Sequence, residues 1–213
     1  MTDSISFQDG SAAVPADGKT VVLLISTMRA GSTLLKALLA TAPDVSDLPE
    51  TDFQKFAGAE AAASMGALAP ERIVLLKRPG WFNELNTYPR LPDDPAVRKI
   101  ILTRDICPTV RSLRKMVFRR FVTFFRAVGN RFLCEKYWAG MHRAFLALHE
   151  APEHRTALVR YEDLTKNPLE ETARLFEFIG SEQVEGVDSY HPPGGYRWQW
   201  GSDDGGEKIQ SLT

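Results

Sequence analysis

TVVLLISTMRAGSTLLKALL, residues 20–39, is the stretch of sequence that decides the fold. It opens with an aliphatic run at residues 21–25, and such a run is typical of a strand that is covered on both faces in a parallel sheet. Small and polar residues surround Gly31, and from Ser32 leucines recur at helical spacing until Pro43 lies beyond the expected helix end. The stretch therefore predicts a strand, a short loop and a helix in direct succession.

The loop between this strand and this helix has the properties of an anion site. The unpaired N–H groups and the positive dipole end of the helix point toward it. Gly31 lets the backbone approach a ligand closely, and Arg29 adds a formal positive charge. An ordinary strand-to-helix turn would look the same, so the loop alone does not identify a ligand.

The loop departs from the nucleotide-binding pattern GxxxxGK[ST] at two positions. Gly31 and Thr33 fit this pattern, whereas Ser26 replaces the first glycine and Ser32 replaces the lysine. Because a kinase or ATPase normally uses that lysine on the β- and γ-phosphates, the departure disfavours an ATP site.

Length and composition limit the classes of protein to consider. The chain has 213 residues and a formal net charge of −1, which suits one domain over residues 20–213 and argues against a nucleic-acid partner. No apolar stretch reaches the roughly 18–20 residues that cross a bilayer, so we expect no stable membrane insertion. Residues 1–19 are polar, lack the features of a signal peptide and are expected to form a disordered leader. The oligomeric state is not indicated.

The two cysteines indicate a compartment. Cys107 and Cys134 match no metal-ligand spacing, so we expect free thiols, a reducing environment and no bound metal. These features together predict a soluble cytoplasmic protein.

Three further aliphatic runs predict strands, at residues 73–76, 97–103 and 156–160. Helices are expected between them: residues 51–68 are Ala-rich, residues 106–132 and 134–150 are helix-prone, and residues 168–179 end at Gly180. Residues 45–50 form another strand or run alongside the sheet, and residues 181–213 are expected to be a tail or lid. This alternation predicts an α/β fold, a three-layer sandwich with a central parallel sheet of about four to five strands flanked by helices.

Polar clusters follow each predicted strand, at residues 26–33, 77–78, 104–105 and 161–163. Ligands of parallel sheets bind outside the carboxyl ends of the strands, so these clusters are expected to form one site. Arg104 ends one strand and Ser112 lies in the following helix, where the two side chains could grip a phosphate from two sides. Two separate anion sites suit a nucleotide with phosphates at two separate positions, unlike ATP.

Three segments carry a family resemblance. ISTMRAGSTLL resembles the 5′-phosphosulfate loop of the sulfotransferases, usually PKSGTT or PRSGST, and KIILTRDICPTVRS is similar to their 3′-phosphate motif RDPxxxxxS, with the proline one place late. VRYEDLTKNPLEETARLFEFIG resembles their (R/K)YEDL segment. The resemblance implies a P-loop-like fold, 3′-phosphoadenosine 5′-phosphosulfate (PAPS) as donor, and a hydroxyl or amine of a small-molecule, lipid or carbohydrate acceptor.

The resemblance also implies roles for individual residues. Arg104 and Ser112 would hold the 3′-phosphate, and Tyr161 would border the adenine. The 5′-phosphosulfate would be held by the loop residues Arg29, Ala30, Gly31, Ser32 and Thr33.

Two departures from the family pattern affect the adenine pocket. Leu34 stands where many members have a tryptophan, and GGYRWQWGSDDGGEK replaces the glycine-rich tail motif RKGxxGxW. Arg197 or Lys208 is then a candidate 3′-phosphate ligand, and Trp198 or Trp200 a candidate cover for the adenine.

Candidate catalytic residues follow from the chemistry of sulfuryl transfer, which needs cations where charge collects on the leaving oxygen. Arg29 fits that requirement. Lys77, in LLKRP, is assigned to the acceptor or the transferring group, with a solvated lysine as the alternative.

The general base is assigned to Glu50. LPETDFQKF resembles the KEVHFF or KEANYF stretch of carbohydrate-type sulfotransferases; the alternative is a glutamate that stabilises a helix N-terminus. A histidine could serve instead: His191 is the rival, whereas His142, His149 and His154 suit surface or packing positions.

Other functions stay open at this stage. A P-loop small-molecule kinase using ATP and Mg²⁺, or a non-catalytic nucleotide-binding protein, would share part of the pattern. Residues 111–131 are rich in Arg, Lys and Phe. Phe118, Phe121 and Phe125 recur at helical spacing, which favours a packed face over an acceptor groove or a membrane contact.

Overall fold

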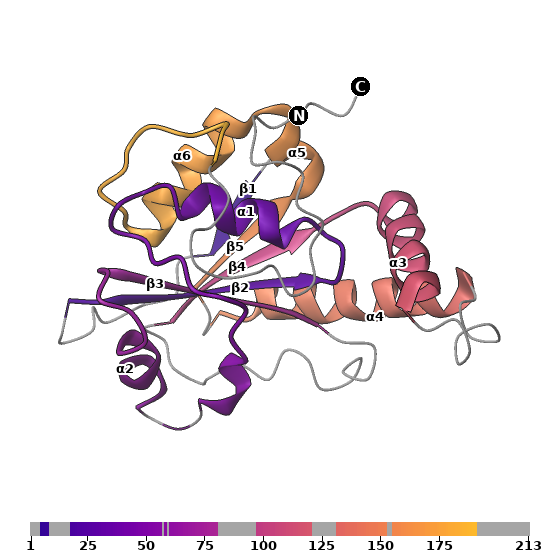
Figure 1. The fold of residues 1–213 in the computed structure, drawn as a ribbon, viewed down its shortest axis with the longest axis horizontal. Helices are drawn as coiled ribbons and strands as arrows, with labels where there is room; N and C mark the ends of the chain where they lie inside the picture. The colour runs from indigo at the N-terminus through magenta and orange to yellow at the C-terminus, as the bar shows by residue number, and fades with distance from the viewer. Residues whose placement is uncertain are drawn as a thin grey trace.

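The structure is a computed structural model, and it describes residues 5–8, 18–56, 58, 60–80, 97–120, 131–152 and 155–190. A five-stranded sheet in the order β1-β5-β4-β2-β3 lies at its centre (Figure 1). Four strands are parallel: β2 (Thr20–Thr27), β3 (Ile73–Gly80), β4 (Arg98–Thr103) and β5 (Thr156–Arg160). The fifth, β1 (Ile5–Gln8), pairs antiparallel with β5 at one edge. The predicted α/β fold with a central parallel sheet is confirmed.

β2 is the central parallel strand, because it pairs with β4 on one side and β3 on the other. All eight of its residues are buried. Val22 and Leu24 pack into one hydrophobic core, and Val21, Leu23 and Ile25 pack into a second. This alternation places one core on each face of the sheet, as the unbroken apolar run predicts.

Helices cover both faces of the sheet (Figure 1). On one face lie α1 (Ser32–Leu39), α5 (Tyr161–Lys166) and α6 (Pro168–Ile179), which ends at Gly180 with φ 74°. On the other lie α2 (Ala61–Gly66) and α4 (Arg131–Glu150). α3 (Ile106–Arg120) stands beyond the end of the sheet toward which β2 points. Among the described helices, none is long and apolar enough to cross a membrane.

Two sequence-based predictions about the first part of the chain are wrong. Residues 1–19 were expected to be a disordered leader, yet Ile5–Gln8 forms β1. A sheet edge offers unpaired N–H and C=O groups, so even a four-residue segment without a strong pattern gains hydrogen bonds there. Residues 51–68 were expected to form one helix, but only a 3₁₀ turn (Phe53–Lys55) and α2 form. Gly58 lies between them with φ 88°, a left-handed conformation that interrupts a helix.

Residues 44–51 run alongside β3 and cover its outer edge. Val45 bridges to Ile73, the Ser46 N–H donates to the Ile73 carbonyl, and the Ser46 hydroxyl accepts from the Leu75 N–H. This segment therefore satisfies part of the backbone hydrogen bonding along the outer edge of β3. Of the two sequence-based alternatives for residues 45–50, the structure shows the one in which they run alongside the sheet.

Several predicted features lie outside the described residues. They are most of the proposed tail or lid from residue 191 onward and the side chains of Phe118, Phe121 and Phe125.

Candidate functional site

The carboxyl ends of β2, β3, β4 and β5 lie at one edge of the sheet, which we call the carboxyl edge. The loop after β2 occupies its middle, because β2 lies between β3 and β4. Side chains that follow β4 therefore approach this loop from one side, and side chains that follow β3 approach it from the other.

The loop after β2 has an unusual backbone. Arg29 and Gly31 both adopt left-handed conformations, with φ 67° and 97°. For a residue with a side chain, that conformation costs about 1–2 kcal/mol, so the rest of the fold must hold Arg29 in place. α1 begins directly after Gly31 with no side-chain cap, which leaves its first N–H groups directed at the loop.

Tyr161 closes the space beside Gly31. A Cβ atom at Gly31 would lie 2.4 Å from both Cδ2 and Cε2 of the Tyr161 ring. The guanidinium carbon of Arg104 lies 4.1 Å from the centroid of the same ring, a cation–π contact. The ring thus contacts both the loop and the cation that follows β4, and the loop accepts no side chain at residue 31.

Arg29, Arg104 and Ser112 meet on the β4 side of the loop. Arg29 Nε donates to Ser112 Oγ at 2.8 Å, and an Arg104 Nη donates to the Arg29 carbonyl at 3.2 Å. Burial lowers the pKa of Arg29, and the nearby charge of Arg104 lowers it further. Arg104 Nε is buried with no hydrogen-bond partner in the described structure. Two close guanidiniums and an unused donor suit a bound polyanion.

Lys77, Glu50 and Thr33 meet on the β3 side of the loop. Lys77 Nζ donates to Glu50 Oε1 at 2.5 Å and to Thr33 Oγ1 at 2.8 Å. The Lys77 side chain is 4% exposed and that of Glu50 is 21% exposed. Burial lowers the pKa of Lys77, and the charge and hydrogen bond of Glu50 oppose that shift only in part. The arrangement places a cation, a carboxylate and a hydroxyl of α1 within contact distance of one another.

The structure thus brings most of the sequence-predicted site residues together. Lys77 is too buried to be the solvated lysine of the alternative interpretation, and Glu50 binds Lys77 in an extended segment rather than at a helix N-terminus. Leu34 is only partly buried and packs against the hydrophobic core on the sheet face that α1 and α6 cover. In this structure it offers no stacking surface like that of the tryptophan found at this position in many family members. Other candidates lie outside the described residues: His154, His191, Arg197, Trp198, Trp200 and Lys208.

Two of the histidines that were expected at surface or packing positions lie in α4, away from the Glu50–Lys77 pair. His149 Nδ1 contacts Thr156 Oγ1 at 2.7 Å, and Thr156 begins β5, so this histidine lies at the amino end of the strand. His142 stacks on Trp138 at a centroid distance of 3.7 Å, and burial lowers its pKa. Both histidines pack α4, as expected for structural positions.

Two residues that sequence reasoning missed, Tyr137 and Trp138, support the carboxyl edge together with Glu162 of the predicted 161–163 cluster. The Tyr137 hydroxyl accepts from the Met28 N–H at 2.9 Å and donates to the Gly80 carbonyl at 2.5 Å. Trp138 Nε1 donates to the Arg104 carbonyl at 2.8 Å, and Glu162 Oε1 accepts from the Asp105 N–H at 3.0 Å. Tyr137 and Trp138 stand in no recognisable motif, because each acts on a backbone group more than 30 residues away in the chain.

The chemistry of the carboxyl edge is that of an anion site. It presents guanidiniums, a buried ammonium, hydroxyls and the N–H groups of a helix N-terminus. In the described part of the chain, no three His, Cys, Asp or Glu side chains are placed to hold a metal ion. These donors suit phosphate and sulfate oxygens.

Comparisons with known proteins agree with this geometry. A model described as the Sulfotransferase family matches residues 69–185, more than half of the chain. The sulfotransferase domain of the curacin biosynthetic pathway has a TM-score of 0.58 at 20% identity, over 78% of this chain and 75% of that chain. The sulfotransferase from Alicyclobacillus acidocaldarius has a TM-score of 0.58 at 14% identity, over 82% and 87%. No curated protein sequence matches the chain significantly.

A third solved structure is similar to the same extent. The sulfotransferase domain of the Synechococcus PCC 7002 olefin synthase has a TM-score of 0.55 at 20% identity, over 80% of this chain and 77% of that chain. At such low identity the three structures show a shared fold, and the roles of individual residues rest on the contacts described above.

Proposed function

We propose that the carboxyl edge of this chain, which belongs to the sulfotransferase family of PAPS-dependent enzymes, holds PAPS. The sulfuryl group passes from this donor to a hydroxyl or amine of a small-molecule, lipid or carbohydrate acceptor. The observation that carries the proposal is the convergence of Arg29, Arg104 and Ser112 beside the uncapped N-terminus of α1. Arg104 and Ser112 lie 75 and 83 residues from Arg29 in the sequence, so only the fold brings these groups together.

The two anionic groups of the donor bind at two neighbouring positions. The 5′-phosphosulfate binds the loop through the N–H groups around Gly31 and the hydroxyls of Ser32 and Thr33. The 3′-phosphate binds Arg104 and Ser112. Arg29 contacts Ser112, so it lies where the two positions adjoin and its charge serves both. The free Nε of Arg104 supports this assignment, because a buried donor without a partner is costly unless a ligand satisfies it.

The tyrosine at the start of α5 closes the loop around the donor. Tyr161 contacts Gly31 and Arg104, so it borders the nucleotide on the β4 side. Arg197 is a further candidate for the 3′-phosphate by its place in the sequence.

Transfer takes place on the β3 side of the loop. As the acceptor oxygen bonds to sulfur, Glu50 accepts the proton that this oxygen releases. The sulfur–oxygen bond of the donor breaks, and Lys77 and Arg29 stabilise the negative charge on the departing phosphate oxygen. The hydrogen bond from Lys77 to Thr33 supports this role, because Thr33 lies in the first turn of α1, next to the loop that holds the phosphosulfate.

A replacement of Glu50 tests the transfer step. We expect Glu50→Gln to lower turnover by about 100-fold or more, the usual size of a general-base effect, while the affinity for adenosine 3′,5′-bisphosphate measured by calorimetry changes little. Asp52→Asn is the matched control, since Asp52 follows in the same segment and pairs with Arg78 at 2.8 Å. An active Glu50→Gln enzyme would remove this residue from the mechanism.

Thermal-shift measurements test the donor. Adenosine 3′,5′-bisphosphate should raise the melting temperature, and Arg104→Ala should abolish the rise. Stabilisation by ATP with Mg²⁺ alone would instead favour the P-loop kinase. Stabilisation by the bisphosphate without sulfuryl transfer to any acceptor would favour a non-catalytic nucleotide-binding protein.

We also propose a cytoplasmic location and a single domain over residues 20–213, to which β1 adds an edge strand. The free state of Cys107 and Cys134 supports a reducing compartment.

A further inference from the structure

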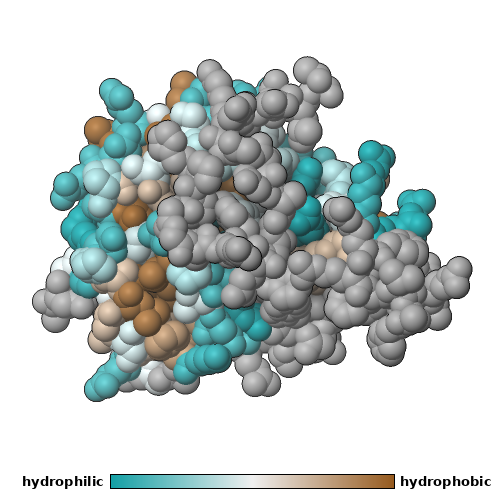
Figure 2. All heavy atoms as spheres, in the orientation of Figure 1, coloured by the Kyte–Doolittle hydropathy of each residue, from teal (hydrophilic) through white to brown (hydrophobic). Residues whose placement is uncertain are grey.

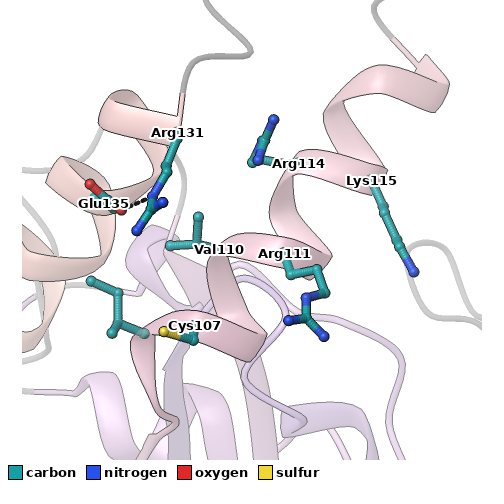
Figure 3. Close-up of a pocket in the computed structure, with 8 residues that line it drawn as sticks. Cys107, Val110, Arg111, Arg114, Lys115, Arg131 and Glu135 are labelled. Atoms are coloured by element: carbon teal, nitrogen blue, oxygen red, sulfur yellow. Dashed lines mark hydrogen bonds and ion pairs between the residues drawn. The ribbon is translucent and has the colours of Figure 1, made fainter.

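A cavity of about 810 Å³ opens between α3 and α4, and Figure 3 shows the side chains that line it. α3 contributes Ile106 and Val110 to its wall, and α4 contributes Arg131 and Glu135. This volume lies in the range of about 300–1,000 Å³ that small-molecule sites occupy. We call it the α3–α4 cavity.

Positive charge dominates the lining of the α3–α4 cavity. Arg111, Arg114 and Lys115 of α3 all line it, and within the described residues none of the three forms an ion pair with an acid. The fourth cation, Arg131, donates to Glu135 at 2.5 Å and is thereby neutralised (Figure 3). Figure 2 shows hydrophilic surface on the side of the molecule where α3 lies. Three uncompensated cations on two turns of one helix repel each other, so a bound anion would stabilise the charged surface.

The α3–α4 cavity lies mainly on the side of α3 that points away from the donor position. Ser112 contacts Arg29, so its side of α3 faces the loop after β2. At about 100° per residue, Arg114 points about 160° and Cys107 about 140° away from Ser112, whereas Arg111 and Lys115 lie at the border of the cavity, about 100° and about 60° away. α3 therefore stands between the donor position and the side of the cavity that holds Cys107 and Arg114, and the Glu50–Lys77 pair lies on the β3 side of β2.

We propose that the α3–α4 cavity is a second binding site, for a small organic anion with an apolar portion and a phosphate or carboxylate head. The head binds Arg111, Arg114 and Lys115, which carry the uncompensated charge. The apolar portion lies against Ile106 and Val110, on the side of α3 that faces α4, and along the aliphatic stems of the arginines. An inorganic anion would leave this apolar wall unused, and a neutral ligand would leave the charge unmatched.

Cys107 provides a reporter inside the cavity itself. It lines the cavity and is exposed, whereas Cys134, the other cysteine of the chain, is buried and its pKa is raised by that burial. Iodoacetamide should therefore modify Cys107 first, and the rate can be followed by mass spectrometry. Octyl phosphate, used below its micelle concentration as the probe, should slow this modification about tenfold at saturation.

Octanol and inorganic phosphate at the same concentrations separate the two parts of the proposed ligand. Each should slow the modification of Cys107 much less than octyl phosphate does. Equal protection by octanol would mean a purely apolar pocket, and equal protection by inorganic phosphate would mean a plain anion site; either result overturns the proposal.

Charge-reversal variants test the role of the cations. Arg114→Glu should abolish protection by octyl phosphate. If this charge reversal prevents folding, Arg114→Gln replaces it and should weaken the protection. Lys136→Glu is the matched control, because Lys136 is an exposed cation of α4 that does not line the cavity. Protection that survives in folded Arg114→Glu, or that is lost equally in Lys136→Glu, contradicts the proposal.

Two further probes distinguish the site from other interpretations. Adenosine 3′,5′-bisphosphate should leave the modification rate of Cys107 unchanged, and protection by it would make the cavity part of the donor position. Vesicles with phosphatidylserine should protect no better than neutral vesicles; protection by anionic vesicles without protection by octyl phosphate would identify a membrane surface instead. Because these readouts need no turnover, they are independent of the proposed transfer function.

Discussion

At the scale of single residues, Gly31 is the position where the backbone tolerates least change. Gly31→Ala combines the left-handed strain of about 1–2 kcal/mol with a Cβ that lies 2.4 Å from the Tyr161 ring. We expect the free energy of unfolding to fall by about 3 kcal/mol in urea titrations, and affinity for adenosine 3′,5′-bisphosphate to fall with it. Gly58→Ala is the control: its φ is 88° and nothing lies within 4 Å of the added atom, so only the strain remains. Equal effects of the two substitutions would contradict the contact with Tyr161.

Lys77 gives the second residue-scale prediction, an alkaline limit to turnover. Its pKa lies below the ordinary 10.5, so the ammonium loses its proton at a lower pH than a solvent-exposed lysine, and turnover should fall as the pH rises through that value. Lys77→Arg keeps its charge at high pH and should move this limb upward in a pH profile of kcat. An unchanged limb in that variant would show that another group titrates.

Stability should respond to Lys77 in the opposite direction. Because its pKa is lower in the folded than in the unfolded chain, the unfolded chain binds more protons between the two values. The contribution of Lys77 to the free energy of unfolding therefore rises with pH over that interval, while activity falls. A simple loss of the fold at high pH would lower both.

At the scale of elements, α3 connects the strand end of β4 to the loop after β2. Ser112→Ala removes the acceptor of Arg29 Nε, and a hydrogen bond to a charged group contributes about 1.5–3 kcal/mol. We expect affinity for adenosine 3′,5′-bisphosphate to fall about tenfold or more by calorimetry. Thr109→Val is the control on the same helix, since the Thr109 hydroxyl is buried without a partner in the described structure. A loss of affinity in Thr109→Val as large as in Ser112→Ala would point to a general disturbance of α3.

The elements differ in how well the sequence predicts them. The four parallel strands and α1, α4 and α6 are predicted from runs of apolar residues or from their helical spacing, because each of these elements buries its apolar side chains in a core. β1 and the 3₁₀ turn show no such run or spacing. β1 exists because β5 offers an open edge, and the Ala-rich residues 51–68 fail to form one helix because Gly58 interrupts them. The first outcome depends on a neighbouring strand that the segment itself does not contain, whereas the second depends on a glycine inside the segment.

At the scale of the whole molecule, Asp44 joins the first half of the chain to the end of α6. Its carboxylate accepts from Arg72 at 2.6 Å, from the Ser181 hydroxyl at 2.6 Å and from the Glu182 N–H at 3.0 Å. Burial raises the pKa of Asp44, but the hydrogen bonds and the charge of Arg72 outweigh it and leave the pKa below its ordinary value. The stabilisation is therefore present above the ordinary pKa and is lost as the pH falls through the folded value.

Asp44→Asn should lower the free energy of unfolding at pH 7 by about 2–3 kcal/mol, the size of one strong charge-assisted hydrogen bond. Its stability should also decline less steeply in acid than that of the unsubstituted protein, as measured by urea titrations between pH 7 and 3. Glu170→Gln, at an exposed position of α6, is the control and should leave both quantities unchanged. If the free energy of unfolding of Asp44→Asn falls as steeply in acid as that of the unsubstituted protein, other carboxylates cause the loss.

The site as a whole was predictable only where motifs recur. The positions of Arg29, Gly31, Arg104 and Ser112 follow from patterns near the ends of strands, whereas the contact of Lys77 with Thr33 and Glu50 depends on the lateral order β4-β2-β3. A sequence lists its strands along the chain and does not state which lie side by side. The three-dimensional fold therefore supplies the pairing of Glu50 with Lys77.

The Tyr137 hydroxyl acts as a spacer between the ends of β2 and β3. It accepts a hydrogen bond from the Met28 N–H and donates one to the Gly80 carbonyl, so a single hydroxyl satisfies one backbone group from each side of the gap. The distance between the loop after β2 and the strand that carries Lys77 is thus set by the length of one phenol from α4. Because the Met28 N–H donates to this buried hydroxyl, we expect its amide proton to exchange with solvent only when α4 moves away from the sheet, so the rigidity of the loop depends on the packing of α4.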